Sequence, residues 1–192
     1  DVYPIVFHNG TVEPATNAGR AQFGAGKSDG AETTADEPAH ELTEEEKLAK
    51  RRQFDKWEPQ VITKGMSKDD CEAKKESLGI SGCYYNNDYF AAAAEMCGGV
   101  QNLPTEDDLY ELSKTIYPNC DDSSKYCSGT PDFSKLPASF SGLGSSWYAL
   151  WSGSESSATN AYDRYFNSSD SFRNNYNRYH SYFRAVCVGD LK

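Results

Sequence analysis

The sequence predicts an α+β fold, in which helices come first along the chain and an antiparallel sheet comes last. Helix-capping patterns recur between residues 43 and 116, whereas apolar and polar residues alternate in several runs after residue 146. The six cysteines are a third observation, because a bond from Cys97 to Cys187 would tie the helical half to the last strand. We therefore expect two or three helices and a small antiparallel sheet in a disulfide-stabilised domain.

Residues 1–60 are predicted to form an extension that tethers or assembles the protein. It opens with one strand-like run, VYPIVF, followed over residues 15–41 by a stretch rich in Ala, Gly, Thr and acidic residues. Such a stretch buries too little apolar surface to offset its ordering entropy, so we expect a mobile or partner-ordered linker. Thr43 and Glu46 then form a capping box that begins a surface helix, which ends before Pro59.

Residues 61–192 are predicted to form the compact domain. Its helices are expected to begin at residues whose side chains can accept a hydrogen bond from the first turn: Ser67, Asp88 and Thr105. Gly79 suits the end of the first of them. After a loop over residues 119–146, the strands are expected in WYALWSGSE, AYDRYFN and YFRAVCVGD, with polar turns between them.

The cysteine spacing favours three disulfides, which form in an oxidising compartment. The pairs Cys71–Cys83 and Cys120–Cys127 close short loops and leave Cys97 to Cys187. The alternative is six buried free thiols, which fits poorly with the polar loop around Cys120 and Cys127. A secreted or cell-surface location follows from the disulfide interpretation.

Composition argues against several classes of function. The formal net charge is −10, which disfavours binding to nucleic acid, and no apolar run is long enough to span a membrane. The three histidines are scattered, so neither a histidine metal site nor a catalytic triad is expected. Clusters of acidic residues leave a structural calcium ion open, although none has EF-hand spacing. We expect no cofactor.

Residues 154–183, the polar-aromatic segment, are built mainly from Ser, Asn, Tyr, Phe and Arg and contain no Lys, Leu, Val or Gly. Recognition loops use Tyr for stiff contact area, and Ser and Asn for adaptable hydrogen bonds. The segment is therefore interpreted as a binding face, with a low-complexity tract as the alternative.

The same segment carries a pattern at the level of codons. Every residue in it except Glu155 can be encoded by a codon that ends in a pyrimidine. Asn, Tyr, Ser, Asp, His, Thr and Phe can all be reached from an Asn codon by changes at its first two bases. This pattern is expected if adenines in a run of Asn codons had been replaced at random.

Four motifs, GGVQNLPTEDDLYEL, LWSGSE, YDRYF and RAVCVGD, occur in this order. They resemble the bacterial and phage C-type lectin fold domains that share ancestry with formylglycine-generating enzymes. More narrowly, the chain is similar to variable proteins that are diversified by diversity-generating retroelements. The resemblance covers roughly residues 61–192 and implies a C-type lectin-like fold that displays a variable ligand-binding face.

Carried over by position, the resemblance implies a buried framework of Trp147, Trp151, Phe166, Ala185 and Val186. Arg164 and Arg173 would be framework residues with exposed head groups. The ligand-facing positions would be Tyr162, Asp163, Tyr165, Asn167, Asp170, Phe172, Asn174, Asn175, Tyr176, Asn177, Tyr179, His180 and Tyr182. On any alternating strand, some of these must point inward.

The sequence also departs from the wider family. It lacks the Glu-Pro-Asn or Gln-Pro-Asp triplet and the Trp-Asn-Asp strand of calcium-dependent sugar binding, and Cys187 is already assigned to a disulfide. We therefore expect no enzymatic activity. The leading hypothesis is a surface-displayed recognition or adhesion protein whose partner is a protein or glycan on another cell or a phage host. The alternatives are a pilus or fibre subunit that assembles through its N-terminal strand, and then a formylglycine-generating type of enzyme.

Overall fold

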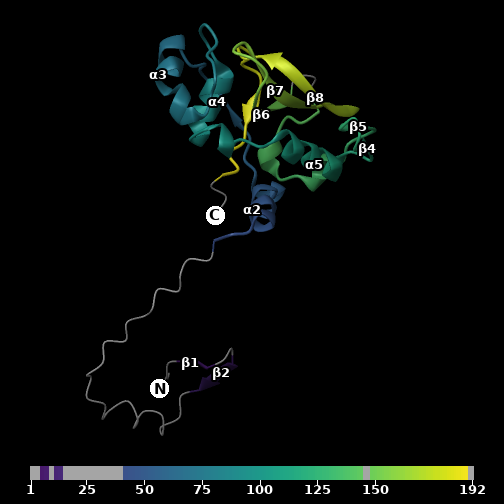
Figure 1. The fold of residues 1–192 in the computed structure, drawn as a ribbon. Coiled ribbons are helices and arrows are strands. Elements are labelled where there is room, and N and C mark those ends of the chain that lie inside the picture. Colours follow the sequence, from purple (N-terminus) through teal and green to yellow (C-terminus); the bar gives the residue numbers. More distant parts are fainter. Residues whose placement is uncertain (1–4, 9–10, 15–40, 145–147, 190–192) are drawn as a thin grey trace, which may run out of the picture. The chain divides into compact units, whose positions relative to one another are not determined.

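The computed structural model describes residues 5–8, 11–14, 41–144 and 148–189. It divides the chain into two units, Asp1–Glu41 and Leu42–Lys192. In the first unit, strand β1 (Ile5–His8) pairs antiparallel with β2 (Thr11–Pro14) (Figure 1). The sequence predicted the first of these strands and not the second. The linker expected after them lies, up to residue 40, outside the described residues.

The second unit is an α+β domain, as predicted. Its described α-helices are α2 (Glu44–Arg51), α3 (Lys68–Leu78), α4 (Tyr89–Cys97) and α5 (Glu106–Ile116). Short 3-10 turns lie at η1 (Phe54–Lys56), η2 (Val100–Asn102), η3 (Phe133–Lys135) and η4 (Ala138–Phe140). No helix in the described part of the chain combines the length and apolar character needed to cross a membrane.

The helices begin where the capping patterns predict. Thr43 and Glu46 form the capping box of α2, and Thr105 and Asp108 form that of α5. The backbone N–H of Asp108 donates to Thr105 Oγ1 at 3.0 Å, and its Oδ2 accepts from the Thr105 N–H at 2.9 Å. Ser67 caps α3, and α3 ends at Gly79 in the left-handed region, with φ of 71°. These local signals were sufficient because each involves residues within one turn of the helix.

The sheet is larger than predicted and is mixed. It has seven strands in the order β3-β9-β6-β7-β8-β5-β4, and only the pair β6–β9 is parallel. The strands are β3 (Gln60–Val61), β4 (Asn119–Asp121), β5 (Tyr126–Ser128), β6 (Ala149–Glu155), β7 (Asn160–Phe166), β8 (Asp170–Asn177) and β9 (Arg184–Ala185). The prediction of a small antiparallel sheet was therefore wrong in size and missed the one parallel pair of described strands.

Two strand predictions need correction. Strand β8 lies in a stretch interpreted as a polar turn, and hairpin β4–β5 lies in a predicted loop. Conversely, YFRAVCVGD supplies only the two-residue strand β9. Since β8 and β9 both run parallel to β6 and lie on opposite sides of the β6–β7 pair, residues 178–183 must cross over both of those strands. We call these residues the crossover.

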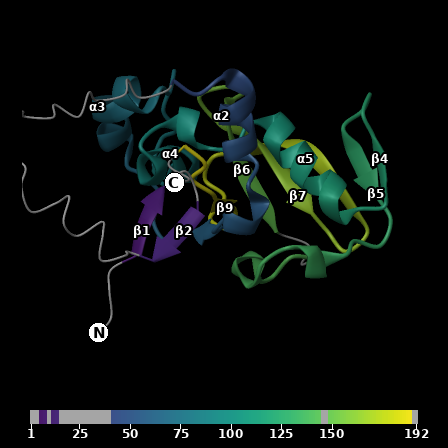
Figure 2. The same ribbon diagram turned by 90° about the horizontal axis from the view of Figure 1, so that it is seen from below.

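Two hydrophobic cores lie on opposite faces of the sheet. One contains residues of α3 and α4 together with Trp151, Tyr165 and Phe183. The other contains residues of α5 together with Leu150 and Phe166. Adjacent residues on β6 and on β7 thus point into different cores, as strand geometry requires. Figure 2 shows α3 and the β4–β5 hairpin at opposite ends of the domain.

The domain begins before residue 61, because the segment before it is packed into the structure. Trp57 is fully buried, and its indole Nε1 donates to the carbonyl of Arg51 at 2.8 Å. Arg51 and Arg52 each form an ion pair of 3.0 Å with the buried carboxylate of Asp108. Burial alone would raise the pKa of Asp108, but the Thr105 N–H and the two guanidinium groups hold it below its usual value. The predicted boundary after residue 60 therefore falls inside the second unit.

All six cysteines are paired as predicted, in Cys71–Cys83, Cys97–Cys187 and Cys120–Cys127. The second bond joins the last residue of α4 to the chain after β9, across a sequence separation of 90 residues. Its long loop gives it the largest expected effect on the entropy of the unfolded chain.

Candidate ligand-binding face

The predicted site residues come from β7, β8, the turn between them and the crossover. Because β7 and β8 pair along their whole length, the structure brings these residues into one region of the sheet. Alternation then divides them between the two faces. The predicted surface is therefore two surfaces, and only one of them continues onto the crossover.

The face toward α3 and α4 carries a group of rings that we call the aromatic cluster: Tyr165, Phe172, Tyr176, His180 and Phe183. Phe172 lies opposite Tyr165, with the ring centroids 5.4 Å apart and the planes stacked. The crossover places His180 4.1 Å from the ring of Tyr176 and Phe183 5.5 Å from it. Phe172 and Tyr176 are half-buried, so the cluster reaches the surface.

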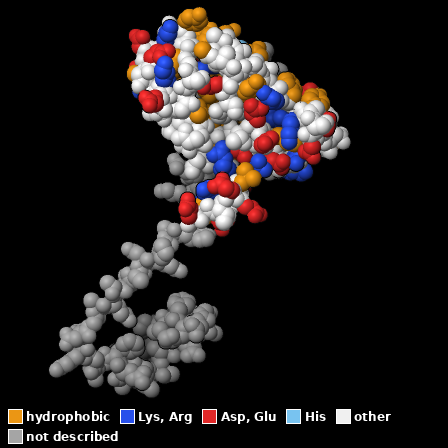
Figure 3. All heavy atoms as spheres, in the orientation of Figure 1, with side chains coloured by type: hydrophobic (Ala, Val, Ile, Leu, Met, Phe, Trp, Pro, Cys, Tyr) orange, Lys and Arg blue, Asp and Glu red, His pale blue; other side chains and the backbone are white. Residues whose placement is uncertain are grey.

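The crossover adds exposed rings beside this cluster. Tyr179 is 50% exposed and stacks on His180, and Tyr182 is 64% exposed. Tyr84, from the loop after Cys83, lies 6.1 Å from Tyr179, and its neighbour Tyr85 is 68% exposed. Figure 3 shows hydrophobic side chains at the top of the view, at the end of the domain where the loop between α3 and α4 lies. The structure thus forms a surface of exposed tyrosines from two distant parts of the chain.

The sequence prediction did not include Tyr84 and Tyr85. The motif CYYNND around them was interpreted only as a strand or turn. Its tyrosines and asparagines match the composition of the polar-aromatic segment, and that similarity was the available signal.

The opposite face, toward α5, holds predicted residues that are paired with the domain. Arg173 lies over the ring of Tyr162 at 3.9 Å and forms an ion pair with Glu106 at 2.7 Å. Asn175 donates to Ser156 Oγ at 2.8 Å. These residues do not join the aromatic cluster.

Two more predicted residues lie at the far end of the hairpin. Asn167 donates to Asp170 Oδ1 at 2.8 Å, and Tyr126 donates to Asp170 Oδ2 at 3.1 Å. They close the β7–β8 turn, away from the crossover. Asn177, at the other end, accepts from the backbone N–H of Tyr179 at 3.2 Å and so orders the start of the crossover.

The exposed fractions of the side chains test which residues the sequence predicted to face the ligand and which to form the framework. Asp163 and Tyr165 were predicted to face the ligand, but only 1% and 5% of them are exposed, because β7 packs on both faces. Trp151, Phe166, Ala185 and Val186 are buried, as a framework role requires, whereas Trp147 lies outside the described residues.

The two framework arginines differ from each other. Arg173 has a partly exposed head group, as predicted. Arg164 is buried instead, and its guanidinium donates to Ser113 Oγ at 2.6 Å, Ser171 Oγ at 2.9 Å and the carbonyl of Lys125 at 2.7 Å. Burial lowers the pKa of Arg164 to about 10, so it stays charged at neutral pH.

Arg178 anchors the crossover, a role that the sequence did not reveal. It is fully buried and forms ion pairs with Asp88 at 2.7 Å and with Glu155 at 2.8 Å. Asp88 also caps α4, so this network joins the crossover to the helix and to β6. Glu155, the exception to the codon pattern, therefore has a structural partner.

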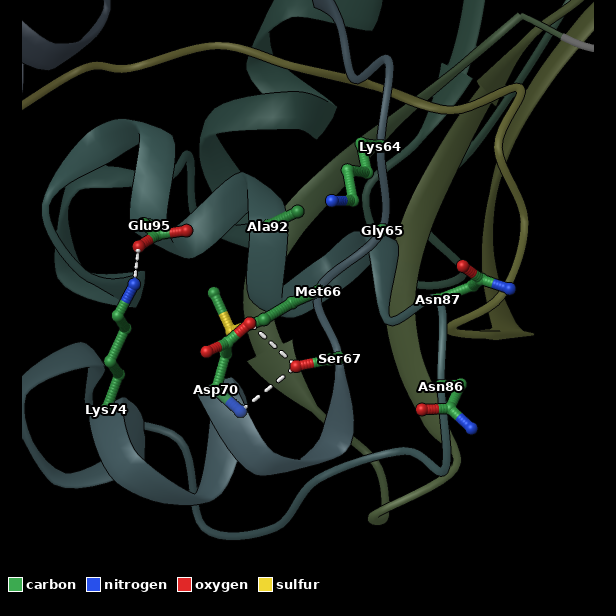
Figure 4. Close-up of a pocket in the computed structure, with 10 residues that line it drawn as sticks. All are labelled: Lys64, Gly65, Met66, Ser67, Asp70, Lys74, Asn86, Asn87, Ala92 and Glu95. Carbon is green, nitrogen blue, oxygen red and sulfur yellow. Dashed lines mark hydrogen bonds and ion pairs between the residues drawn. The ribbon is translucent and has the colours of Figure 1, made fainter.

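A separate polar pocket of about 470 Å³ lies between the N-terminal part of α3 and one side of α4 (Figure 4). Its charged groups are largely paired with each other: Lys74 bonds to Glu95, and Ser67 donates to Asp70 at 2.7 Å. None of the predicted ligand-facing residues lines it. Among the residues that the structure describes, no group of three His, Cys, Asp or Glu side chains could hold a metal ion.

Comparisons of the chain with protein-family models, with curated proteins and with solved structures found no match.

Proposed function

We propose that residues 42–192 form a non-enzymatic recognition domain with a C-type lectin-like fold, displayed outside the cell. Its binding surface is formed by the half-buried members of the aromatic cluster, the exposed tyrosines of the crossover and Tyr84–Tyr85. One observation carries this proposal. The crossover holds two tyrosines that are at least half exposed, yet its first residue, Arg178, is locked by two buried ion pairs. Stiff, exposed aromatic residues on a fixed backbone favour binding, because little side-chain entropy is lost on contact.

The proposal includes diversification of this surface between copies of the protein by a retroelement. The support is the codon pattern together with the exposure of residues that fit it. In the crossover Tyr179, Ser181 and Tyr182 face solvent, whereas Arg178 and Phe183 are buried and pack into the domain. A scaffold that holds its crossover through buried groups tolerates change at the exposed ones.

Three disulfides and the exposed binding surface are compatible with a secreted or cell-surface location. In that setting the ligand is a protein or glycan on another cell or on a phage host. The pilus or fibre alternative has weaker support, because one edge of β1 is already paired with β2.

The test compares two double variants of the purified full chain. Tyr179→Ala/Tyr182→Ala removes the two most exposed rings of the crossover, while Val61→Ala/Met96→Ala removes two exposed apolar side chains elsewhere. Binding is measured on a glycan array and on a panel of bacterial cells by flow cytometry. We expect the first variant to lose about tenfold or more in binding, and the control to lose none. Equal binding by the wild type and the first variant contradicts the proposed surface.

A genomic observation tests the diversification. We expect a reverse transcriptase gene nearby, with a near-copy of the segment that differs only at adenines. Multiple sequenced copies that are invariant at Tyr179 and Tyr182 contradict this part of the proposal.

A further inference from the structure

Asp163 is a buried carboxyl group that the fold does not satisfy. It is 1% exposed, and neither of its carboxylate oxygens has a hydrogen-bond partner within the described structure. The other buried side-chain acids described above, Asp88 and Asp108, are both paired with arginine. An unpaired buried carboxyl group carries a desolvation cost that Asp88 and Asp108 offset through their arginine partners, so its position calls for an explanation.

The position of Asp163 is the middle of the proposed binding face. On β7 it lies between Ala161 and Tyr165 in the alternation, so it points to the side of the aromatic cluster. Its partners across the sheet are Trp151 on β6 and Asn174 on β8. The indole Nε1 of Trp151 is also buried and has no hydrogen-bond partner among the described residues.

Aromatic rings surround this position. Phe183 packs on Trp151 with 4.7 Å between ring centroids, and on Tyr165 with 5.6 Å. Along β8, Phe172 and Tyr176 flank Asn174 on the same face, and all three are half-buried. The neighbours of Asp163 on the β8 side are therefore side chains at the protein surface, which a ligand can displace without unfolding the sheet.

An acidic group among aromatic rings matches one kind of ligand chemistry. Ring faces attract cations, and a buried carboxylate gains most from a cationic hydrogen-bond donor. A metal ion fits poorly, because it needs several oxygen or nitrogen ligands and the described residues hold no such group. The net charge of −10 also favours the approach of a cation.

We propose that Asp163 is the anchor of a subsite for an organic cation, an alkylammonium or guanidinium group such as a protein ligand presents on Lys or Arg. The cation inserts beside Phe172 and Tyr176, contacts their rings and bonds to Asp163. This inference rests on the proposed function and narrows its ligand class from protein or glycan to a protein with an exposed basic side chain.

The experiment follows the indole N–H signal of Trp151 in ¹H–¹⁵N spectra of the full chain, assigned with Trp151→Phe. The probes are N-acetyl-lysine methylamide, N-acetyl-arginine methylamide and the neutral N-acetyl-norleucine methylamide. We expect at least one cationic probe to shift the signal saturably, and the neutral probe to bind about tenfold more weakly or not at all.

Asp163→Asn keeps the shape of the side chain but cannot become a carboxylate when a cation binds, so we expect it to abolish the saturable shift. Asp170→Asn is the matched control, since Asp170 lies at the far end of the hairpin, and it should leave binding unchanged. Three outcomes overturn the subsite: no saturation by either cation, equal binding of the neutral probe, or cation binding that survives Asp163→Asn. Cell or glycan binding that still depends on Tyr179 and Tyr182 would show that the recognition function stands without the subsite.

Discussion

The two faces of the β7–β8 hairpin differ in how their polar groups are satisfied. Toward α5, Arg164 bonds to two serines and a carbonyl, and Arg173 pairs with Glu106. Toward the aromatic cluster, Asp163 has no partner within the described structure, and Tyr179 and Tyr182 are exposed on the crossover. One face of the same hairpin thus has its polar groups paired within the domain, whereas the other leaves the carboxyl group of Asp163 unpaired beside exposed tyrosines.

The largest effect on stability is expected at Arg164, on the face of the hairpin toward α5. Arg164→Met removes the donor that serves the buried hydroxyls of Ser113 and Ser171 and the partly buried carbonyl of Lys125. Leaving these groups without that donor costs about 2–3 kcal/mol of unfolding free energy. Chemical denaturation measures this loss.

The control for this prediction is Arg173→Met. Its head group is about half exposed, with a side-chain exposure of 47%, so its ion pair with Glu106 contributes less than about 1 kcal/mol. Equal losses of unfolding free energy in Arg164→Met and Arg173→Met would contradict the view that buried, fully paired polar groups on this face stabilise the domain.

A smaller effect is expected within the aromatic cluster. The composition of the segment predicts that replacing Tyr176 and Tyr179 together by Ala leaves the melting temperature nearly unchanged. The ring of Tyr176 packs against Phe183 and Tyr165, so we expect a different result at this position. Tyr176→Ala is expected to cost about 1–2 kcal/mol, because a half-buried ring loses its packing.

Tyr179→Ala is expected to cost less than about 0.5 kcal/mol, since half of this residue is exposed. Thermal unfolding of the two single variants measures the difference. If both variants unfold at the wild-type temperature, the packing of Tyr176 in the aromatic cluster does not contribute to the stability of the protein.

The sequence predicted the parts of this fold that are decided locally. Helix caps such as Thr105 with Asp108 involve neighbouring residues, and two of the disulfides close short loops. Strand β8 was missed because Asn and Asp have low strand propensity, and it forms through its pairing with the whole length of β7. The domain boundary was misplaced for a related reason, since the burial of Trp57 depends on distant residues.

The candidate site was predictable as a segment but not as a surface. Composition pointed to residues 154–183, and alternation required that some of them face inward. Which face is open depends on where α5 packs and on the path of the crossover, and that path is fixed in part by Asp88, which lies outside the segment. Asp163 illustrates the limit: its residue type suggested an exposed contact, and its packing makes it a buried, unsatisfied group.

The last predicted effect has the opposite sign, because Asp163→Asn should stabilise the protein at neutral pH. Burial raises the pKa of Asp163 well above its usual value of about 4. Below about pH 4 the carboxyl group of Asp163 is protonated in both the folded and the unfolded protein, so it contributes no pH dependence to stability. As the pH rises from about 4, the unfolded chain releases this proton while the folded chain retains it, so stability is lost until the pH passes the raised pKa.

Asp163→Asn removes this penalty, so the melting temperature of the variant relative to the wild type should rise between about pH 4 and pH 7. The pKa of His180 is lowered by burial, and its titration is common to both proteins, so it largely cancels in the comparison. Calorimetry of both proteins across this range gives the difference directly. A difference that stays constant with pH would mean that Asp163 already has a partner in solution, and the contrast between the two faces would then lose its main support.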